Sequence, residues 1–312
     1  MTFTKKHVAV LMGGWSGERE VSLTSAKGII AALREIGHHV TPIDVTRDIP
    51  KLIKDLTPRP DVVMNILHGK YGEDGRIQSL LDILDIPYTF SNHCASALAM
   101  DKDLSKKIFI TTDIATPNWK KTSKEEAFSG KVTLPIPYVL KPNDEGSSLG
   151  VFIINEQADL HNACQEWRYG NDVMIEEYIA GKELSVAIIN GKAVGILELR
   201  PKFGFYDYKA KYTDGITDHI MPADVPANIY QLALENSEKA YSAIGCSGIA
   251  RADFRYDETR ANGDQLHLLE INTQPGMTPL SIVPDIANHV GIPFKELVQM
   301  MIEDVVCNEK CA

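Results

Sequence analysis

The sequence predicts a protein of mixed α/β and α+β class with three domains, spanning residues 1–92, 93–178 and 179–312. Its 312 residues are too many for one ordinary hydrophobic core. Strand-like and helix-like runs alternate through the first domain, which predicts a parallel sheet with helices on both faces. The middle domain has helical runs followed by short strands, which predicts a small α+β unit. In the last domain, β-prone runs are paired through Asn-Gly dipeptides, which indicates antiparallel hairpins.

The composition is that of a soluble globular protein, with 44% apolar and 24% charged residues. A net charge of −10 argues against a nucleic-acid partner, and no run approaches the roughly 18 apolar residues that span a bilayer, so no membrane partner is expected. The first residues lack a long apolar region and a cleavage site, so we expect no signal peptide and a cytoplasmic location. The five cysteines are odd in number and mostly scattered, which predicts free thiols. Cys307 and Cys311 lie one helical turn apart, but a metal site would need further ligands.

The N-terminal domain is expected to carry two polar clusters, 13–18 and 68–74, at the carboxyl ends of its strands. Ligands of parallel sheets bind at such strand ends. Glu18 opens a helix, so its charge is explained either by the helix dipole or by binding of a substrate ammonium. His68 is likewise either structural or catalytic, and the residues alone leave both questions open. The predicted elements are strands at 5–12, 39–45 and 61–66 and helices at 18–36 and 75–84, the first of them capped by Gly37.

The central domain contains a loop rich in Gly and Ser, Lys141–Gly150, between two strands that are expected to be antiparallel. Successive backbone amides of such a loop can cradle phosphates, with Lys141 as a positive charge at its entrance. A loop of this kind is usually only a connection, and the sequence has no Walker A motif, so phosphate binding depends on evidence from elsewhere in the chain. The predicted elements are helices at 93–100, 101–113 and 156–168 and strands at 136–140, 151–154 and 172–176.

The C-terminal domain contains a long aromatic segment at about 203–216. Disordered segments are poor in aromatic residues, so this segment is interpreted as a lid that closes over a site. The predicted elements around it are strands at 183–189 and 193–199, joined through Asn190-Gly191, and amphipathic helices at 226–243 and 293–303.

The whole chain is organised around a hairpin predicted from two apolar runs, 247–256 and 265–271, which flank a polar segment containing Asn262-Gly263. Side chains two apart on a strand share a face, so a fold at residues 261–262 places four polar groups together. These are Arg251 opposite Asn272 and Asp253 opposite Glu270. The other face is expected to be apolar and to carry Ala252, Phe254, Leu269 and Ile271.

This polar face predicts a metal-dependent nucleotide site. Carboxylates gathered in a protein are costly without a compensating cation, and oxygen donors with no His or Cys nearby favour Mg²⁺ or Mn²⁺ over Zn²⁺. Because Mg²⁺ is usually held by one or two carboxylates together with substrate phosphates, the same face predicts a nucleotide. A solvated hairpin with salt-bridged charges is the simpler alternative. It does not explain why all four groups share one face.

In this order along the whole chain, the polar motifs resemble those of the D-alanine–D-alanine ligases of the ATP-grasp superfamily. No single motif is sufficient, but the ordered set is highly specific. The motifs are G-G-x-S-x-E-R-E-V-S-L (Gly13–Leu23), H-G-x-x-G-E-D-G (His68–Gly75), M-D-K (Met100–Lys102), K-P-x-x-E-G-S-S-x-G (Lys141–Gly150), Y-D-Y-x-A-K-Y (Tyr206–Tyr212), R-x-D (Arg251–Asp253) and E-x-N-T-x-P-G-M-T (Glu270–Thr278).

The resemblance implies an ATP-grasp fold, in which ATP lies between the central and C-terminal sheets and the first domain is the pre-ATP-grasp domain. The implied reaction is 2 D-alanine + ATP → D-alanyl-D-alanine + ADP + phosphate, through a D-alanyl phosphate, for peptidoglycan precursor synthesis. The implied cofactors are two Mg²⁺ or Mn²⁺ ions, and a monovalent cation is left open. The family also implies a homodimer. Tyr212 is typically missing from ligases that form D-alanyl-D-lactate, so its presence predicts acceptance of an amine.

Carried over residue by residue, the resemblance implies the following roles. The metal ligands would be Asp253, Glu270 and Asn272. ATP would be bound by Lys102, Lys141, Ser147, Ser148, Glu176, Glu177, Ile179, Glu183 and Lys211. The first D-alanine would be held by Glu18 and His68, oxyanions by Arg251 and the Gly276 N–H, and the carboxylate of the second D-alanine by Ser281 and Ile282. Tyr212 and Ser147 would tie the lid to Glu18.

Two alternatives compete with this interpretation. Another ATP-grasp ligase would share Lys141, Arg251 and the metal ligands, but not Glu18, Tyr212 and Ser281 as a set. A non-catalytic nucleotide sensor would be expected to have lost metal carboxylates, which this chain retains. The sequence also departs from the family pattern: Gln274 stands where relatives often carry Ser or Met, and Pro279-Leu280 replaces a polar pair.

Overall fold

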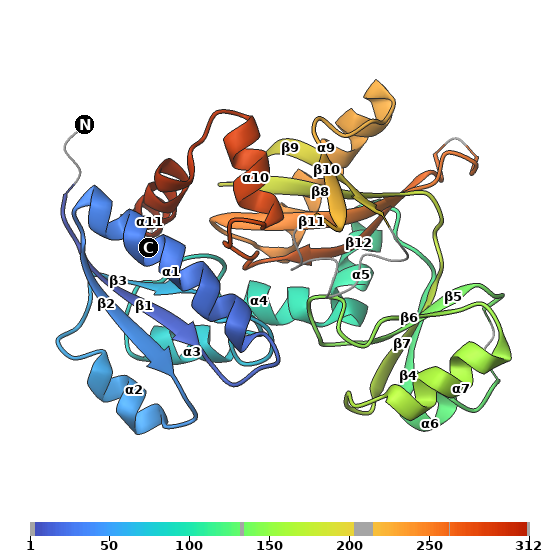
Figure 1. Ribbon diagram of the computed structural model, residues 1–312, viewed down its shortest axis with the longest axis horizontal. Coiled ribbons are helices and arrows are strands. Elements are labelled where there is room, and N and C mark those ends of the chain that lie inside the picture. The colour runs from blue at the N-terminus through green and yellow to red at the C-terminus, as the bar shows by residue number, and fades with distance from the viewer. Residues whose placement is uncertain (1–3, 132–133, 203–214, 262, 311–312) are drawn as a thin grey trace.

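Three sheets, each with its own covering helices, make up the chain (Figure 1). The structure, a computed structural model, describes residues 4–131, 134–202, 215–261 and 263–310, with side chains as far as residue 305. One sheet is parallel and the other two are antiparallel, which confirms the predicted fold class. The predicted domain boundaries stay a prediction. The predicted lid lies almost entirely outside the described residues.

The N-terminal sheet is parallel, with the strand order β2-β1-β3, and has helices on both faces as predicted. Helices α1 and α11 pack on one face, and α2 and α3 cover the other. Gly37 ends α1 with a φ of 103°, in the left-handed conformation expected of a C-cap. Helix α2 was not predicted; it is short and is capped by Asp48, which accepts a hydrogen bond from the Lys51 N–H. The elements are β1 (His7–Gly13), α1 (Arg19–Ile36), β2 (His39–Val45), α2 (Ile49–Asp55), β3 (Val62–Asn65), α3 (Arg76–Ile83) and α11 (Phe294–Lys310).

The central sheet is antiparallel, with the strand order β4-β7-β5-β6. Helices α6 and α7 cover it around a small core that includes Leu140, Ile175 and Trp167. The Gly/Ser loop joins β5 to β6, as predicted. Strand β4 and helix α6 were not predicted, because their lysine-rich sequence carries little hydrophobic periodicity. The elements are α4 (His93–Met100), α5 (Lys102–Thr111), β4 (Trp119–Ser123), α6 (Lys124–Ala127), β5 (Tyr138–Pro142), β6 (Phe152–Ile154), α7 (Gln157–Glu166) and β7 (Asp172–Glu177).

The C-terminal sheet is antiparallel, with the strand order β10-β9-β8-β11-β12. One face packs on α9, α4 and α5. The other packs on α10 and shares a continuous core with α1 and the N-terminal sheet, so the two sheets are held together by apolar contacts. Strand β10 and helix α10 were not predicted. The elements are β8 (Lys182–Ile189), β9 (Lys192–Pro201), β10 (Thr217–Ile220), α9 (Ala227–Ile244), β11 (Ile249–Tyr256), β12 (Leu266–Asn272) and α10 (Ile282–His289).

The β11–β12 hairpin has the predicted register near its end. Arg251 pairs with Asn272, and Asp253 pairs with Glu270. The prediction for Leu269 was wrong: the register shifts between Asp253 and the next residue, and this bulge turns Leu269 toward the polar face, where it lines a cleft. The two-residue alternation along a strand predicts correctly which face a side chain occupies only as far as the first bulge.

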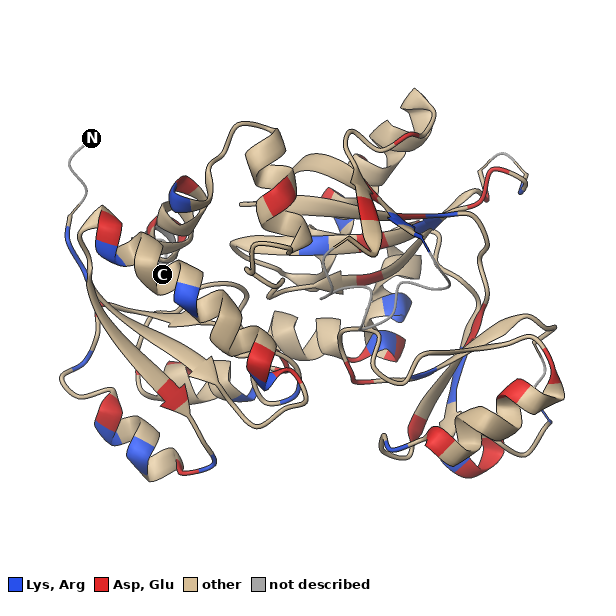
Figure 2. Cartoon of the chain, in the orientation of Figure 1, with Lys and Arg blue, Asp and Glu red and all other residues tan. Residues whose placement is uncertain are grey.

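Charged residues of both signs are interspersed over all three sheets (Figure 2). None of the helices in the described ranges is long and apolar enough to cross a membrane. Cys94, Cys164 and Cys246 are free, as predicted. The side chains of Cys307 and Cys311 lie outside the described part of the chain.

Candidate active site

A cleft with about 820 Å³ of empty space lies between the central and C-terminal sheets. Charged side chains of both signs make up half of its lining, and apolar side chains make up most of the rest. The cleft brings together residues that lie up to 168 positions apart, from Lys102 to Glu270. The predicted ATP and metal residues that line it are Lys102, Lys141, Ser148, Glu176, Glu177, Ile179, Glu183, Asp253 and Glu270.

A buried ion cluster forms the back of this cleft. The Glu176 carboxylate lies 2.6 Å from Lys141 Nζ through Oε1 and 2.6 Å from Lys106 Nζ through Oε2. Burial alone would raise the pKa of Glu176, but the two lysines outweigh it and lower that pKa. Burial lowers the pKa of Lys106 to about 8, against the attraction of Glu176. Lys141 therefore lines the cleft and is paired there with a carboxylate.

Lys106 was missed by the sequence analysis, although the sequence carries a signal for it. It follows Lys102 by four positions on α5, so both lysines lie on the same helix face. Its side chain is fully buried, and Nζ also lies 2.6 Å from Thr116 Oγ1. A lysine at helical spacing from a predicted phosphate-binding lysine is the feature that could have indicated it.

The expected metal ligands lie at the end of the β11–β12 hairpin. Asp253 accepts a hydrogen bond from Ser185 Oγ at 2.6 Å and from Arg251 Nη2 at 2.7 Å. Glu270 lies 3.2 Å from Lys102 Nζ, and Asn272 Oδ1 accepts a hydrogen bond at 2.8 Å from a backbone N–H. The positive charges of Arg251 and Lys102 thus offset the negative charges of the Asp253 and Glu270 carboxylates.

This donor set fits a hard divalent cation. Asp253 and Glu270 are direct cross-strand partners, a spacing at which two carboxylates can reach one ion, and Asn272 adds an amide oxygen. The described residues contain no cluster of three His, Cys, Asp or Glu side chains that could hold a metal. An ion at this place would depend on Asn272 and on phosphate oxygens in addition to the two carboxylates, as is common for Mg²⁺.

The Gly/Ser loop has an unusual backbone. Ser147 and Ser148 both adopt positive φ angles, of 50° and 57°, which is uncommon for residues other than Gly. Such consecutive left-handed residues occur at strained functional loops and can turn successive N–H groups toward an anion. Lys102 Nζ donates a 2.6 Å hydrogen bond to the Glu145 carbonyl at the start of this loop. The loop and Lys102 together can form a phosphate cradle.

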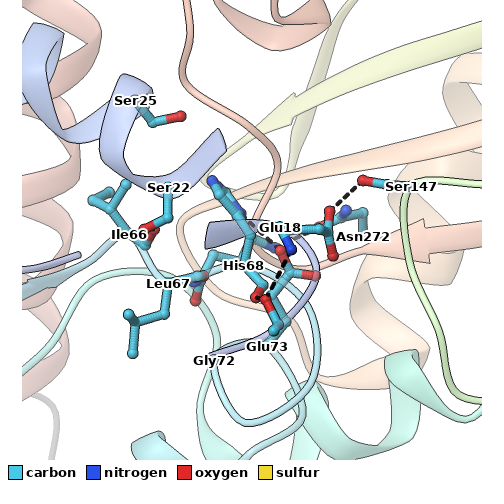
Figure 3. Close-up of polar contacts among 12 residues, drawn as sticks. Glu18, Ser22, Ser25, Ile66, Leu67, His68, Gly72, Glu73, Ser147 and Asn272 are labelled. Atoms are coloured by element: carbon cyan, nitrogen blue, oxygen red, sulfur yellow. Dashed lines mark hydrogen bonds and ion pairs between the residues drawn. The ribbon is translucent and has the colours of Figure 1, made fainter. Parts of the chain in front are cut away.

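Glu18 is buried, with 4% of its surface exposed, and faces the same loop. It is the N-cap residue of α1, but its side chain makes no capping hydrogen bond. Instead it accepts a hydrogen bond from Ser147 Oγ, 129 residues away (Figure 3). A purely local role at the start of the helix does not account for this contact.

His68 and Glu73 lie beside Glu18 (Figure 3). His68 Nδ1 is 2.8 Å from Glu73 Oε1, and Nε2 is buried with no hydrogen-bond partner among the described residues. Burial would lower the pKa of His68, but the hydrogen bond and charge of Glu73, together with the charge of Glu18, raise it above its usual value. A buried ring nitrogen without a partner is expected to face a ligand. Glu73 was not predicted; it lies within the His68–Gly75 motif.

A smaller cleft, with about 320 Å³ of empty space, lies beside the larger one and shares Lys102, Glu145, Gly146 and Glu270 with it. Glu73, Glu270 and Asn272 line it, and Gly146 lines both clefts. A Cβ atom on Gly146 would lie 3.3 Å from Glu18 Oε2 and 3.9 Å from Glu73 Oε2. Gly146 therefore brings Glu18 and Glu73 next to the residues that line both clefts.

The remaining predicted residues surround this site. Ser281 Oγ accepts a 2.9 Å hydrogen bond from the Thr278 N–H, and a Cβ on Gly276 would lie 2.9 Å from the same Oγ, so Gly276 and Ser281 are adjacent. Ile282 begins α10. The Glu177 carboxylate is bound by Arg260, at 2.8 Å, which leaves the backbone for any contact with a base.

Glu183, the residue expected to bind ribose, is paired with Arg255 at 3.3 Å. Lys211 and Tyr212 lie outside the described residues.

The comparisons with known proteins cover this whole arrangement. The profile described as "D-ala D-ala ligase C-terminus" matches residues 101–303, and the one described as "D-ala D-ala ligase N-terminus" matches residues 7–56 and 50–91. A D-alanine–D-alanine ligase from Azorhizobium caulinodans is 50% identical over 304 residues, which cover 96% of this chain and 98% of that protein.

Two solved structures extend the likeness to three dimensions. A D-alanine–D-alanine ligase from Bacillus anthracis, complexed with ATP, superposes with a TM-score of 0.81 at 34% identity and covers 99% of each chain. A D-Ala:D-Ser ligase from Enterococcus faecalis gives a TM-score of 0.80 at 27% identity over 97% of this chain and 100% of its own. Every predicted site residue lies within the residues that the two profiles match. This chain belongs to the D-alanine–D-alanine ligase family.

Proposed function

We propose that this protein joins two D-alanine molecules into D-alanyl-D-alanine with conversion of ATP to ADP and phosphate. One observation carries the proposal: Glu73 lines the smaller cleft together with Glu270 and Asn272, and Glu18 lies against Gly146, which lines both clefts. An α-amino acid held by its ammonium at Glu18 would have its carboxylate near the phosphoryl group of a nucleotide in the larger cleft. Family membership supports the choice of D-alanine.

The chemistry requires activation of a carboxylate, which is a poor electrophile. Transfer of the γ-phosphoryl group to the first D-alanine gives an acyl phosphate, which the amine of the second D-alanine attacks with release of phosphate. His68 Nε2, which is buried with no hydrogen-bond partner within the described ranges, would present an N–H to the first carboxylate. Arg251 and the Gly276 N–H would stabilise the oxyanion of the tetrahedral intermediate, because donors fixed in place need no reorganisation during the reaction.

The positive charges of the cleft would offset the charge of the phosphates. Lys102 and Lys141 line the cleft together with the Gly/Ser loop, whose Ser147 and Ser148 backbone would hold the phosphoryl oxygens. Asp253, Glu270 and Asn272 would hold two Mg²⁺ or Mn²⁺ ions, which would supply charge stabilisation and alignment of the phosphoryl group. These three side chains supply the oxygen donors that such ions prefer.

The second D-alanine is proposed to bind with its carboxylate at Ser281 and the Ile282 N–H. Both residues begin α10, where the backbone N–H groups favour an anion. For the adenosine, Glu176, Glu177 and Ile179 are proposed to seat the base through the backbone at the end of β7, and Glu183 to bind the ribose. A homodimer, a cytoplasmic location and a role in peptidoglycan precursor synthesis complete the proposal, on the basis of the family.

The test is to incubate the purified protein with ATP, Mg²⁺ and D-alanine and to measure phosphate release and dipeptide mass together. Equal amounts of dipeptide and phosphate, with none from L-alanine, are expected. An added arm supplies D-alanine together with D-serine, because one structural relative is a D-Ala:D-Ser ligase. Phosphate release without D-alanyl-D-alanine would contradict the proposed substrate, and a mixed product in excess would reassign the second site.

A further inference from the structure

Three buried side-chain amides form a hydrogen-bonded cluster beside the active site. They are Asn65 at the end of β3, Gln78 in α3, and Gln274, which follows β12. All three are at most 1% exposed. None of them is assigned a role in the proposed reaction.

Two amide donors of the cluster share two acceptors. Asn65 Nδ2 donates to the Gly72 carbonyl at 3.0 Å and to Gln274 Oε1 at 3.0 Å. Gln78 Nε2 donates to the same two oxygens, at 2.9 Å and 3.5 Å. Gln274 completes the cluster by donating from Nε2 to the Leu67 carbonyl. Both polar ends of the Gln274 side chain thus bind partners, Asn65 and Leu67, that lie 209 and 207 positions earlier in the sequence.

The two backbone carbonyls in this cluster bracket the pocket of the first substrate. Leu67 directly precedes His68, and Gly72 directly precedes Glu73 (Figure 3). The cluster therefore fastens both ends of the loop that carries this histidine–glutamate pair. At the other side, the Gln274 N–H donates a 2.8 Å hydrogen bond to Asn272 Oδ1, the amide oxygen expected to reach a metal ion. One residue therefore contacts the loop with its side chain and the metal-site strand with its backbone.

We propose that Gln274 is a positioning residue that holds the His68–Glu73 loop at a fixed position relative to Asn272. It thereby aligns the first D-alanine with the phosphoryl-transfer site. This inference rests on the proposed function. Its physical basis is that Asn65 and Gln274 bind the carbonyls at the two ends of the loop and that an unpaired buried polar group is costly, so a displaced loop would lose these hydrogen bonds. Small displacements of a reacting group reduce rates steeply.

The experiment compares Gln274→Met with Gln299→Met. Methionine keeps the shape of glutamine but cannot make the hydrogen bonds of the amide. Gln299, in α11, is also buried, at 7% exposure, and binds His38 at 3.1 Å and Glu303 at 3.0 Å, away from the site. It is therefore a matched control for the loss of a buried glutamine.

The first readout is amide hydrogen exchange of the segment 66–75, which does not depend on substrate. Gln274→Met is expected to speed exchange there by roughly tenfold, the effect of one lost buried hydrogen bond, while Gln299→Met leaves it unchanged. A second variant, Gln78→Met, should give the same local effect, so the test survives if Gln274→Met does not fold. Equal exchange of 66–75 in wild type and in both cluster variants would overturn the proposal.

The second readout is kinetic. Gln274→Met is expected to lower kcat/KM for D-alanine by roughly 10- to 100-fold, while KM for ATP and the melting temperature relative to Gln299→Met change little. Combining it with Gln78→Met should add little further loss, because both act on one cluster. Equal losses of kcat/KM for D-alanine and for ATP would mean that the cluster has only a structural role. If wild type itself makes no dipeptide, the proposed substrate fails, and the exchange experiment still decides whether Gln274 holds the loop.

Discussion

Replacement of Lys106 by methionine is expected to destabilise the fold through the carboxylate that it leaves behind. Lys106 is fully buried, and its Nζ lies 2.6 Å from Glu176 Oε2. Removing one partner of a buried ion pair typically costs about 3–5 kcal/mol, because the other charge stays buried. Lys141 remains 2.6 Å from the second oxygen of Glu176, so the expected loss lies near the lower end, at about 3 kcal/mol.

The assay is urea unfolding of wild type, Lys106→Met, Glu176→Gln, Lys106→Met/Glu176→Gln and the control Lys107→Met. Lys107 is the adjacent lysine, with 61% of its side chain exposed and an ion pair to Asp103, so its loss should cost at most about 1 kcal/mol. The two losses should not add in the double variant, because Glu176→Gln removes the carboxylate that Lys106→Met leaves unpaired; recovery is partial, because buried Lys141 then loses its own partner. A loss for Lys106→Met no larger than for Lys107→Met, or additive losses in the double variant, would refute the reasoning.

The pH dependence gives an independent check on the same side chain. Burial lowers the pKa of Lys106 to about 8 in the folded protein, below the 10.5 of a free lysine. Between these values the unfolded chain binds the extra proton, so the contribution of Lys106 to stability rises with pH through this window. Lys106→Met should lack this rise. An identical slope for both proteins between pH 8 and 10.5 would show that Lys106 titrates normally.

Four further outcomes are expected. Glu270→Gln should abolish turnover with an unchanged melting transition; normal turnover would contradict a metal site at Asp253, Glu270 and Asn272. Removal of divalent ions with EDTA should stop turnover until Mg²⁺ or Mn²⁺ is restored, and activity that persists in EDTA would contradict a metal requirement. Because the pKa of His68 is raised in the folded protein, its contribution to stability is complete below about pH 6.5 and is lost as pH rises through the folded pKa. His68→Asn should therefore remove this fall of the unfolding free energy with pH. An unchanged fall in the variant would mean that another group causes it. Gly181→Ala drives a Cβ into the Tyr256 carbonyl at a φ of +83°, so thermal unfolding should show a loss of at least about 2 kcal/mol, and a melting temperature equal to wild type would contradict it.

The polar face of the β11–β12 hairpin, which carries the expected metal ligands, could be predicted from the sequence because it depends on local periodicity. Alternation along two strands and a single turn were enough to pair Asp253 with Glu270, and the structure confirms that register. The same reasoning failed for Leu269, because a bulge shifts the pattern by one residue and no turn signal marks a bulge inside a strand. Periodicity therefore predicts a face reliably only between irregularities.

The roles of Glu18 and Gln274 could not be settled in this way, because their partners are remote. Glu18 begins a helix in either interpretation, and only its contact with Ser147, 129 residues away, separates a substrate-facing carboxylate from one that serves the helix dipole. Gln274 is a polar residue after a strand, a position typical of solvent-exposed side chains, until Asn65 and Gln78 are found around it. Whether a buried polar side chain is tolerated depends on partners that tertiary packing supplies, so a sequence identifies groups capable of chemistry but not the groups that hold them in place.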